Sequence, residues 1–199
     1  KYNDYKKLKD KNYYVRIDSK FINGKMHYGE IIIKGKTTNQ ILLSTNICHP
    51  SMANNELSGP VLTLMLSNYL KTINNWYTYR IIFIPETIGS IAYLNKNKKN
   101  IENIVGGFNI VCVGDDNNYS LLKSRYGNTI SDKVAESILK KNNIKFKTYS
   151  YLERGSDERQ YCSPGVDLPI ASVMRSKYGT YKEYHTSDDN LHFVSSKGL

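Results

Sequence analysis

The sequence predicts an α/β domain with three layers, α/β/α, and a mostly parallel central sheet. Apolar runs of strand length alternate with amphipathic stretches of helix length along the 199 residues. Polar loops follow several of these runs, at the strand ends where an open sheet carries its ligand sites. A chain of this length buries one good core, so residues 1–199 are predicted to form a single domain.

Three strands are predicted near the start of the chain. Residues Tyr13–Asp18 alternate in polarity, and Met26–Lys34 returns as a second strand after Asn23-Gly24, a strong hairpin signal. The run Ile41–Ile47 is apolar and β-branched, as a buried strand is. We expect these early strands to pair antiparallel at one side of the sheet.

Helices and further strands alternate along the rest of the chain. The loop from Glu153 to Pro169 is long for a compact domain, and such loops usually carry function. Ser131 is the predicted cap of its helix. The predicted strands are Tyr77–Ile84, Ile104–Val113, Tyr119–Lys123, Phe146–Leu152 and Ile170–Met174. The predicted helices are Leu57–Ile73 (apolar at Val61, Leu64, Leu66, Tyr69 and Leu70), Ile88–Asn95, Ser131–Asn142 (Val134, Ile138 and Leu139 inward) and one that begins near Asn190.

The composition argues against some classes of partner. The formal charge is +10, but the lysines are spread along the chain and no aromatic-basic motif accompanies them. A solvated basic surface is therefore favoured over an anionic partner, and no nucleic-acid partner is expected for this fragment. No apolar run reaches the roughly 18–20 residues of a membrane span. The three cysteines lack a framework spacing, which fits the reducing cytoplasm.

Four residues that could carry chemistry stand at strand ends or in long loops. His49 follows the run Ile41–Ile47, and Glu86 follows the next strand. Asp157 lies in the long loop, and His185 follows the last strand. Strand ends of an open sheet share one edge, so these residues can meet there. Two histidines with carboxylates suit a divalent ion, usually zinc, and a carboxylate beside the ion can accept a proton from its bound water.

Each of these residues also has an ordinary structural explanation. Glu86 could cap the helix that begins at Ile88, and Asp157 could cap a turn. The pair Asp188-Asp189 is predicted to cap the last helix. These explanations weaken for the set of four, because all lie where the fold would place a site. His27 and His192 are assigned to hydrogen-bonded or surface positions, and Cys48 and Cys112 to apolar positions within the sheet.

Four separated motifs resemble the zinc aminopeptidase family, the co-catalytic metallo-exopeptidases that include the glutaminyl cyclases. That family has a strand-end His and an acidic pair before Ser-Gly, then Glu-Glu-x-Gly, then Ser-Asp-His, and last His-Thr-x-x-Asp. The match runs from Ile41 to Asn190, and four motifs in the family's order are fairly specific. The matching positions are His49 with Asn54-Asn55-Glu56-Leu57-Ser58-Gly59, Glu86-Thr87-Ile88-Gly89-Ser90, Ser156-Asp157-Glu158 with Tyr161, and Tyr184-His185-Thr186-Ser187-Asp188-Asp189.

Three segments narrow the resemblance further. The stretches CHPSMANNELSGP, PETIGS and GSDERQYCSPG are similar to a bacterial group of aminopeptidase-like proteins, often encoded among polysaccharide or surface-glycan biosynthesis genes. Members of that group resemble a zinc aminopeptidase domain interrupted by a small inserted domain and followed by a C-terminal winged helix. The chain does not begin with Met, and Ser195–Leu199 stops inside a predicted helix. We therefore expect a fragment of a longer protein, the part that follows the insertion.

The sequence departs from the family at several metal ligands. The bridging Asp of the family is Asn55 here, a neutral amide and a poor zinc ligand, and the second Glu of Glu-Glu is Thr87. The next Asp ligand falls near Val111, and Asp115 could replace it only through a local shift of the chain. The resemblance therefore implies at most one metal ion.

The remaining positions define the expected site. One Zn²⁺ would be held by His49, Asn55 and His185, with Glu86 as general base or as a further ligand. Glu56 could replace Asn55 if the helix start moves by one residue. Arg159 could hold a substrate carboxylate with two hydrogen bonds. The residues expected to support the ligands or line the pocket are Glu56, Asp157 and Arg159.

Three functions are compatible with these observations. The first is a mononuclear zinc hydrolase that cleaves an amide bond of a peptide or of an amide-bearing small molecule such as a sugar. The second is a non-catalytic metal- or ligand-binding module of the same fold, linked to surface-polysaccharide biosynthesis. The third is a nucleic-acid regulator that acts through the basic surface. No membrane partner is expected, and a homo-oligomer is left open.

Overall fold

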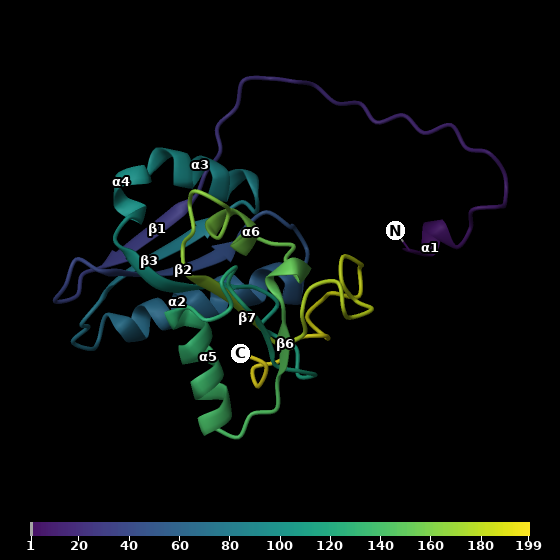
Figure 1. Ribbon diagram of the computed structural model, residues 1–199. Coiled ribbons are helices and arrows are strands. Elements are labelled where there is room, and N and C mark those ends of the chain that lie inside the picture. The colour runs from purple at the N-terminus through teal and green to yellow at the C-terminus, as the bar shows by residue number, and fades with distance from the viewer. Residues whose placement is uncertain (1) are drawn as a thin grey trace.

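The computed structural model describes residues 2–199, and its centre is a seven-stranded sheet (Figure 1). The strands are β1 (Gly29–Ile33), β2 (Gln40–Asn46), β3 (Thr78–Ile84), β4 (Ile104–Ile110), β5 (Ser120–Leu122), β6 (Lys147–Tyr149) and β7 (Ile170–Met174). They lie in the order β1-β3-β2-β4-β7-β5-β6. Among the described residues only the pairs β1·β3 and β5·β7 are antiparallel, so the prediction of a mostly parallel sheet is confirmed.

Helices cover both faces of the sheet, which gives the three predicted layers (Figure 1). The residues Ile81 and Ile82 of β3 are both fully buried, in the clusters on opposite faces. Successive strand residues point to opposite faces, so a strand covered on both sides is apolar throughout. The helices are α1 (Tyr2–Tyr5), α2 (Ser58–Leu70), α3 (Ile88–Lys96), α4 (Lys98–Ile101), α5 (Ile130–Lys141) and α6 (Glu158–Tyr161), with a π turn η1 (Ala53–Leu57) and a 3₁₀ turn η2 (Tyr151–Glu153).

The predicted hairpin near the start of the chain is wrong. Residues 6–28 form neither helix nor strand and run outside the body of the sheet (Figure 1). Strand β1 pairs antiparallel with β3 instead, with Glu30 opposite Ile82. A lone two-stranded hairpin is marginal unless its apolar face is covered, and Tyr14, Val15 and Ile17 are exposed. The third predicted strand, β2, is also not antiparallel: it runs parallel to both β3 and β4.

Helix α2 follows the π turn and packs very close to the sheet. A Cβ on Gly59 would lie 2.3 Å from the hydroxyl oxygen of Thr45 and 2.5 Å from a backbone oxygen of β4, so only glycine fits. Small buried residues, Thr63 and Ser67, continue this contact. Large side chains are therefore displaced from it, and three of the predicted apolar positions are exposed: Val61, Leu64 and Tyr69.

Thr129, and not Ser131, caps helix α5. The side chain of Thr129 forms a capping box with the third residue of the helix. Ser131 instead donates a 2.5 Å hydrogen bond to the carbonyl that precedes β7. Of the three side chains predicted to face inward, Leu139 packs on the core, whereas Val134 and Ile138 are exposed.

No helix begins near Asn190 in the described part of the chain, where residues 181–199 form successive turns. Asp189, predicted to cap that helix, is fully buried elsewhere. Its carboxylate accepts the backbone N–H groups of Asn54 at 2.6 Å and Asn55 at 3.0 Å. Asp189 therefore caps η1, because those donors have no partner within the turn.

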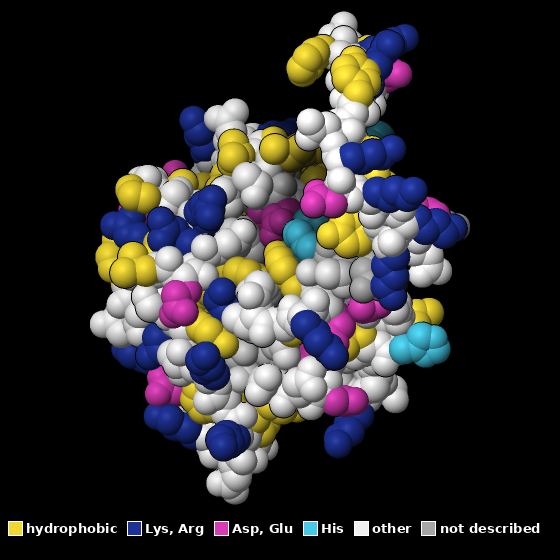
Figure 2. Space-filling view, turned by 90° about the vertical axis from the view of Figure 1, so that its right-hand side faces the viewer, with side chains coloured by type: hydrophobic (Ala, Val, Ile, Leu, Met, Phe, Trp, Pro, Cys, Tyr) yellow, Lys and Arg dark blue, Asp and Glu magenta, His cyan; other side chains and the backbone are white. Residues whose placement is uncertain are grey.

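The surface shows no concentration of positive charge on the face drawn in Figure 2, where Lys and Arg side chains are scattered. In the described residues no helix is long and apolar enough to cross a membrane.

Candidate metal centre

Three of the predicted site residues meet at one edge of the sheet. His49, Glu86 and His185 follow β2, β3 and β7, which run in the same direction and end at this edge. The ring centroids of the two histidines are 5.1 Å apart, and Nε2 of His49 lies 3.7 Å from Oε2 of Glu86. Zinc bonds to nitrogen and oxygen are about 2.0–2.2 Å long, so this spacing lets one ion reach both atoms.

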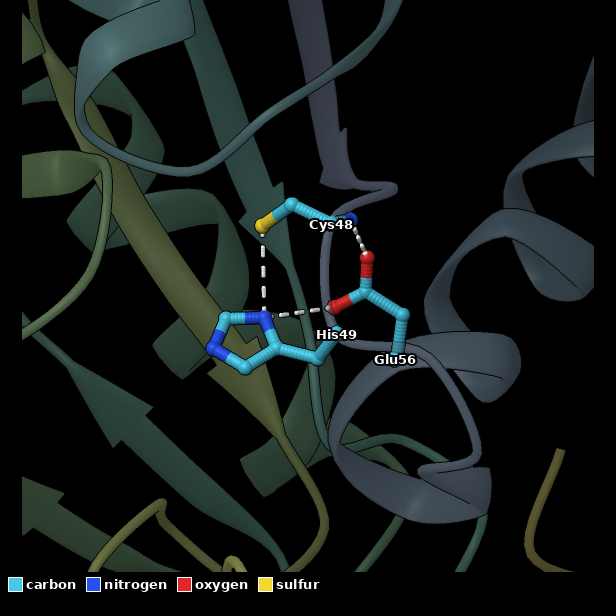
Figure 3. Close-up of side chains that lie close together, drawn as sticks. All are labelled: Cys48, His49 and Glu56. Carbon is cyan, nitrogen blue, oxygen red and sulfur yellow. Dashed lines mark hydrogen bonds and ion pairs between the residues drawn. The ribbon is translucent and has the colours of Figure 1, made fainter. Parts of the chain in front are cut away.

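A carboxylate and a thiol hold the ring of His49 (Figure 3). Nδ1 of His49 lies 3.0 Å from Oε2 of Glu56 and 3.2 Å from Sγ of Cys48. The other oxygen of Glu56 accepts the backbone N–H of Cys48, and Glu56 is only 5% exposed. An ionised carboxylate can only accept, so it favours the tautomer with the proton on Nδ1. That tautomer leaves Nε2 of His49 as the free nitrogen.

Cys48 is not an apolar residue within the sheet, as the sequence had suggested. Its thiol is exposed at the site, where it also accepts the backbone N–H of Glu86 at 3.1 Å. Partial burial raises the pKa of this thiol to about 11, so it is protonated at neutral pH. The potential ligand atoms of Cys48, His49 and Glu56 all lie within 4.8 Å of one another. Cys112, by contrast, is buried as predicted.

A strained turn directs Glu86 toward the histidines. Thr87 has φ 64° and ψ −71°, and the N–H of Ile88 donates to the carbonyl of Glu86 at 2.8 Å. This is a γ-turn with positive φ, which is rare and strained for a β-branched residue. Oε1 of Glu86 accepts hydrogen bonds from Oγ of Ser156 at 2.5 Å and from Nδ2 of Asn46 at 3.1 Å. These two bonds leave Oε2 for the imidazole.

Asp157 supports that turn from inside the protein. Its Oδ1 accepts the N–H of Thr87 at 2.7 Å and the hydroxyl of Ser90 at 2.8 Å. The carboxyl group is fully buried, and burial raises its pKa to about 7. Its Oδ2 has no hydrogen-bond partner among the described residues. Asp157 therefore holds the turn beneath Glu86 and is partly protonated near neutral pH.

Glu158 anchors the loop that carries Ser156 and Asp157. One of its oxygens accepts the N–H groups of Gly155 and Ser156, at 2.9 and 3.0 Å, and the hydroxyl of Tyr178 at 2.7 Å. Its second oxygen binds two side chains of the sheet, Asn109 and Ser172. A fully buried carboxylate with five donors is stable there. Glu158, which stands where the zinc aminopeptidase motif Ser-Asp-His has its His, is therefore a structural anchor.

Asn55 has a buried oxygen with no partner among the described residues. Its Nδ2 is directed at Sγ of Cys112, 3.7 Å away, while Oδ1 is buried without a hydrogen bond. An unpaired buried oxygen is costly, and a bound ion would satisfy it. The alternative ligand considered from the sequence, Asp115, is fully buried and accepts bonds from Asn54 and Ser176. Asp115 is therefore held in the interior by these bonds.

An aromatic loop presents His185. The ring of Tyr184 stacks on it at 4.0 Å, and Tyr181 meets Tyr184 edge to face at 5.5 Å. His185 itself has φ 56°, a conformation that L residues rarely adopt. The exposed imidazole is thus held beside an aromatic wall on the rim of the site.

Some residues were misplaced or missed by the sequence analysis. Arg159 is exposed and lines a separate cavity of about 940 Å³ beside α3 and α4, which none of the three residues His49, Glu86 and His185 lines. Asn46 was missed, although a buried amide at the end of an apolar strand is a recognisable signal. His27 and His192 are exposed, as predicted.

The sheet and the helices on its two faces have the aminopeptidase and glutaminyl cyclase fold. The aminopeptidase of Aneurinibacillus sp. strain AM-1 superposes with a TM-score of 0.73 and 19% identity, over 86% of this chain and 44% of that chain. A zinc aminopeptidase of Bacillus subtilis gives 0.70 and 18%, over 85% and 45%. A glutaminyl cyclase of an Acidobacteriales bacterium gives 0.68 and 18%, over 87% and 68%. At these identities the likeness concerns the fold.

The chain belongs to the family described as a domain of unknown function, DUF4910, which matches residues 14–199. A Clostridium acetobutylicum protein, named provisionally as a polysaccharide biosynthesis protein with an aminopeptidase-like domain, is 41% identical over 99% of this chain and 45% of its own length. The crystal structure of a Clostridium acetobutylicum protein that is provisionally named a peptidase has 40% sequence identity and a TM-score of 0.83, over 86% of this chain and 40% of that chain. The chain thus spans less than half the length of these relatives.

Proposed function

We propose that this domain is a mononuclear zinc-dependent hydrolase of amide bonds. The observation that carries the proposal is the approach of His49 to both His185 and Glu86, with 5.1 Å between the rings and 3.7 Å to the carboxylate. Two imidazoles are nitrogen ligands that zinc prefers, and a carboxylate beside them can accept a proton from a water molecule. The family's other carboxylate positions hold Asn55 and Thr87, which argues for one ion.

The residues present fit such an ion. Nε2 of His49 is free because Nδ1 faces Glu56. Oδ1 of Asn55 is buried and lacks a partner in the described chain, as a ligand atom would before it binds. We assign the ion to His49, Asn55 and His185. When bound, zinc would polarise the substrate carbonyl and lower the pKa of a water molecule.

Glu86 is the general base in this proposal. Its Oε1 is fixed by Ser156 and Asn46, so Oε2 is held in one orientation beside His49. From there it would accept a proton from the attacking water and deliver it to the leaving amine. The strained turn at Thr87 keeps the carboxylate at this position.

The substrate class is a peptide or an amide-bearing sugar. The fold is shared with aminopeptidases, and the 41% identical relative is named for polysaccharide biosynthesis. The wall formed by Tyr184 and Tyr181 offers an apolar surface for a side chain or a sugar ring. All three cysteines are free, which suits a reducing compartment such as the cytoplasm.

Zinc content and hydrolysis together test the proposal. Purified protein should contain about one zinc ion per chain, and the variants His49→Ala and His185→Ala should lose it. His192→Ala is the matched control, because His192 is exposed away from the site. Glu86→Ala should keep the metal. Its rate of hydrolysis on a panel of aminoacyl, peptide and N-acyl sugar substrates should fall about 10²–10⁴-fold. Absence of bound metal under all conditions would eliminate the hydrolase.

A non-catalytic binding module of the same fold is the second candidate. The neutral Asn55 and Thr87 in place of acidic ligands favour it, because each change weakens the electrostatics of the site. Zinc retained in the wild type, with no hydrolysis of any substrate in the panel, would select this function.

A further inference from the structure

A second cavity, of about 510 Å³, lies at the ends of β5 and β6. It shares no residue with the metal centre. Three of its lining side chains are cationic, Lys123, Arg125 and Arg154, and no Asp or Glu of the described chain lines it. A cavity whose charged lining residues are all cationic raises the local concentration of anions.

The two arginines of this cavity are each stacked on a neighbouring tyrosine. The guanidinium of Arg125 lies 5.1 Å from the ring centroid of Tyr126, and that of Arg154 lies 4.6 Å from the ring of Tyr151. Both tyrosines also line the cavity. Stacking holds a guanidinium in a defined plane, so less freedom is lost when its fork binds an oxyanion.

Two of the three cations form ion pairs with carboxylates, and the third does not among the described residues. Lys123 pairs with Glu136 at 3.3 Å, and Arg125 pairs with Asp167 at 2.6 Å. Arg154 forms no ion pair with any described residue. Its NH1 donates to the carbonyl of Tyr151 at 3.2 Å, while its Nε is buried without an acceptor. Arg154 is therefore the lining cation whose charge no described carboxylate offsets, and this charge remains available to an anion in the cavity.

We propose that this cavity binds a small molecule through a phosphoryl group, with Arg154 as its principal contact. A phosphoryl group offers more acceptor oxygens than a carboxylate, so it can bind Arg154 together with other donors of the lining. Ser150 lines the same cavity and its hydroxyl adds a donor, whereas the hydroxyl of Ser124 donates to Asp132. The volume exceeds that of one anion and suits a phosphorylated sugar or a nucleoside phosphate. This inference is independent of the proposed hydrolase activity.

Titration of the isotope-labelled protein with pyrophosphate, followed by amide NMR, tests the proposal. The backbone signals of residues 123–127 and 150–154 should shift, and those at the metal centre should not. Arg154→Gln should weaken pyrophosphate binding about tenfold or more, because one charge-assisted contact is lost. The matched control is Arg16→Gln, an exposed arginine outside the cavity, which should bind like the wild type.

A second ligand tests which anion the cavity prefers, and a second variant is used if the first does not fold. Galacturonate, a carboxylate with a sugar ring, should bind more weakly than pyrophosphate; the reverse order would overturn the phosphoryl assignment. Lys123→Gln serves if Arg154→Gln fails to fold, and it too should weaken binding. Absence of shifts at millimolar pyrophosphate, or equal affinity in the cavity variants and in Arg16→Gln, would overturn the site itself.

Discussion

Replacing Glu56 with Gln tests how the orientation of His49 is controlled. In the wild type the two carboxylate oxygens each receive one donor, the backbone N–H of Cys48 and Nδ1 of His49. The amide of Gln has a single acceptor oxygen, so one of these donors loses its partner. Loss of such an orienting carboxylate typically lowers metal affinity about 10–100-fold, or about 1.4–2.7 kcal/mol.

The assay is a competition between the protein and a chromogenic zinc chelator at fixed pH. Glu102→Gln is the matched control, since Glu102 lies on the surface outside the site. Urea unfolding of the metal-free forms separates a local effect from a loss of fold, because an unpaired buried group costs about 1–3 kcal/mol of stability. If Glu56→Gln bound zinc within about twofold of the wild type, the orienting role of Glu56 would be refuted.

Three further predictions concern the residues beneath the site. Burial raises the pKa of Asp157 from 3.8 to about 7, so the folded protein retains a proton between these values and the free energy of unfolding should fall as pH rises through them. The free energy of unfolding should fall by up to roughly 4 kcal/mol in a pH series of urea titrations, and Asp157→Asn should remove this fall. Parallel plots of the free energy of unfolding against pH for the wild type and Asp157→Asn would contradict the prediction. Thr87→Gly should raise stability by about 1 kcal/mol by relieving its positive φ. The control is Thr38→Gly, at an exposed threonine that does not have a positive φ, which should lower stability; the opposite order would disprove strain. Asp189→Ala should lower stability by about 2–4 kcal/mol in the same titrations, because two backbone donors lose their acceptor, while the exposed Asp188→Ala should change little; equal effects would exclude the cap.

Sequence patterns predicted the sheet well where burial decides the structure. Strands β2, β3 and β7 read as apolar runs because both of their faces are covered, so composition alone distinguishes them. The first hairpin was predicted wrongly because its turn signal is local, while the pairing of β1 with β3 is a long-range choice. A turn signal such as Asn23-Gly24 indicates only that two neighbouring segments can pair. It carries no information on a strand far away in the sequence that buries more apolar area when it pairs.

The proximity of three candidate residues could be predicted from the sequence, and the contacts that support them could not. His49, Glu86 and His185 could be placed at one edge because parallel strands end together. The roles of Asn46 and Asp189 could not be anticipated, because both bind groups far away in the sequence. The position of Cys48 depended on the conformation after β2, which places its sulfur beside the imidazole rather than in the sheet.

The π turn at Ala53–Leu57 has a consequence for how relatives of this chain should be aligned. One additional residue in a helical turn rotates every preceding side chain by about 100° relative to the helix that follows. Helix α2 stays fixed against the sheet by Gly59, so the change is absorbed entirely upstream. A homologue without the additional residue of the π turn would direct a different side chain toward His49, even if its sequence were identical to this chain throughout α2. Superposition of relatives, together with counting from Ser58, therefore bears on whether Asn55 or Glu56 corresponds to a given residue of a homologue.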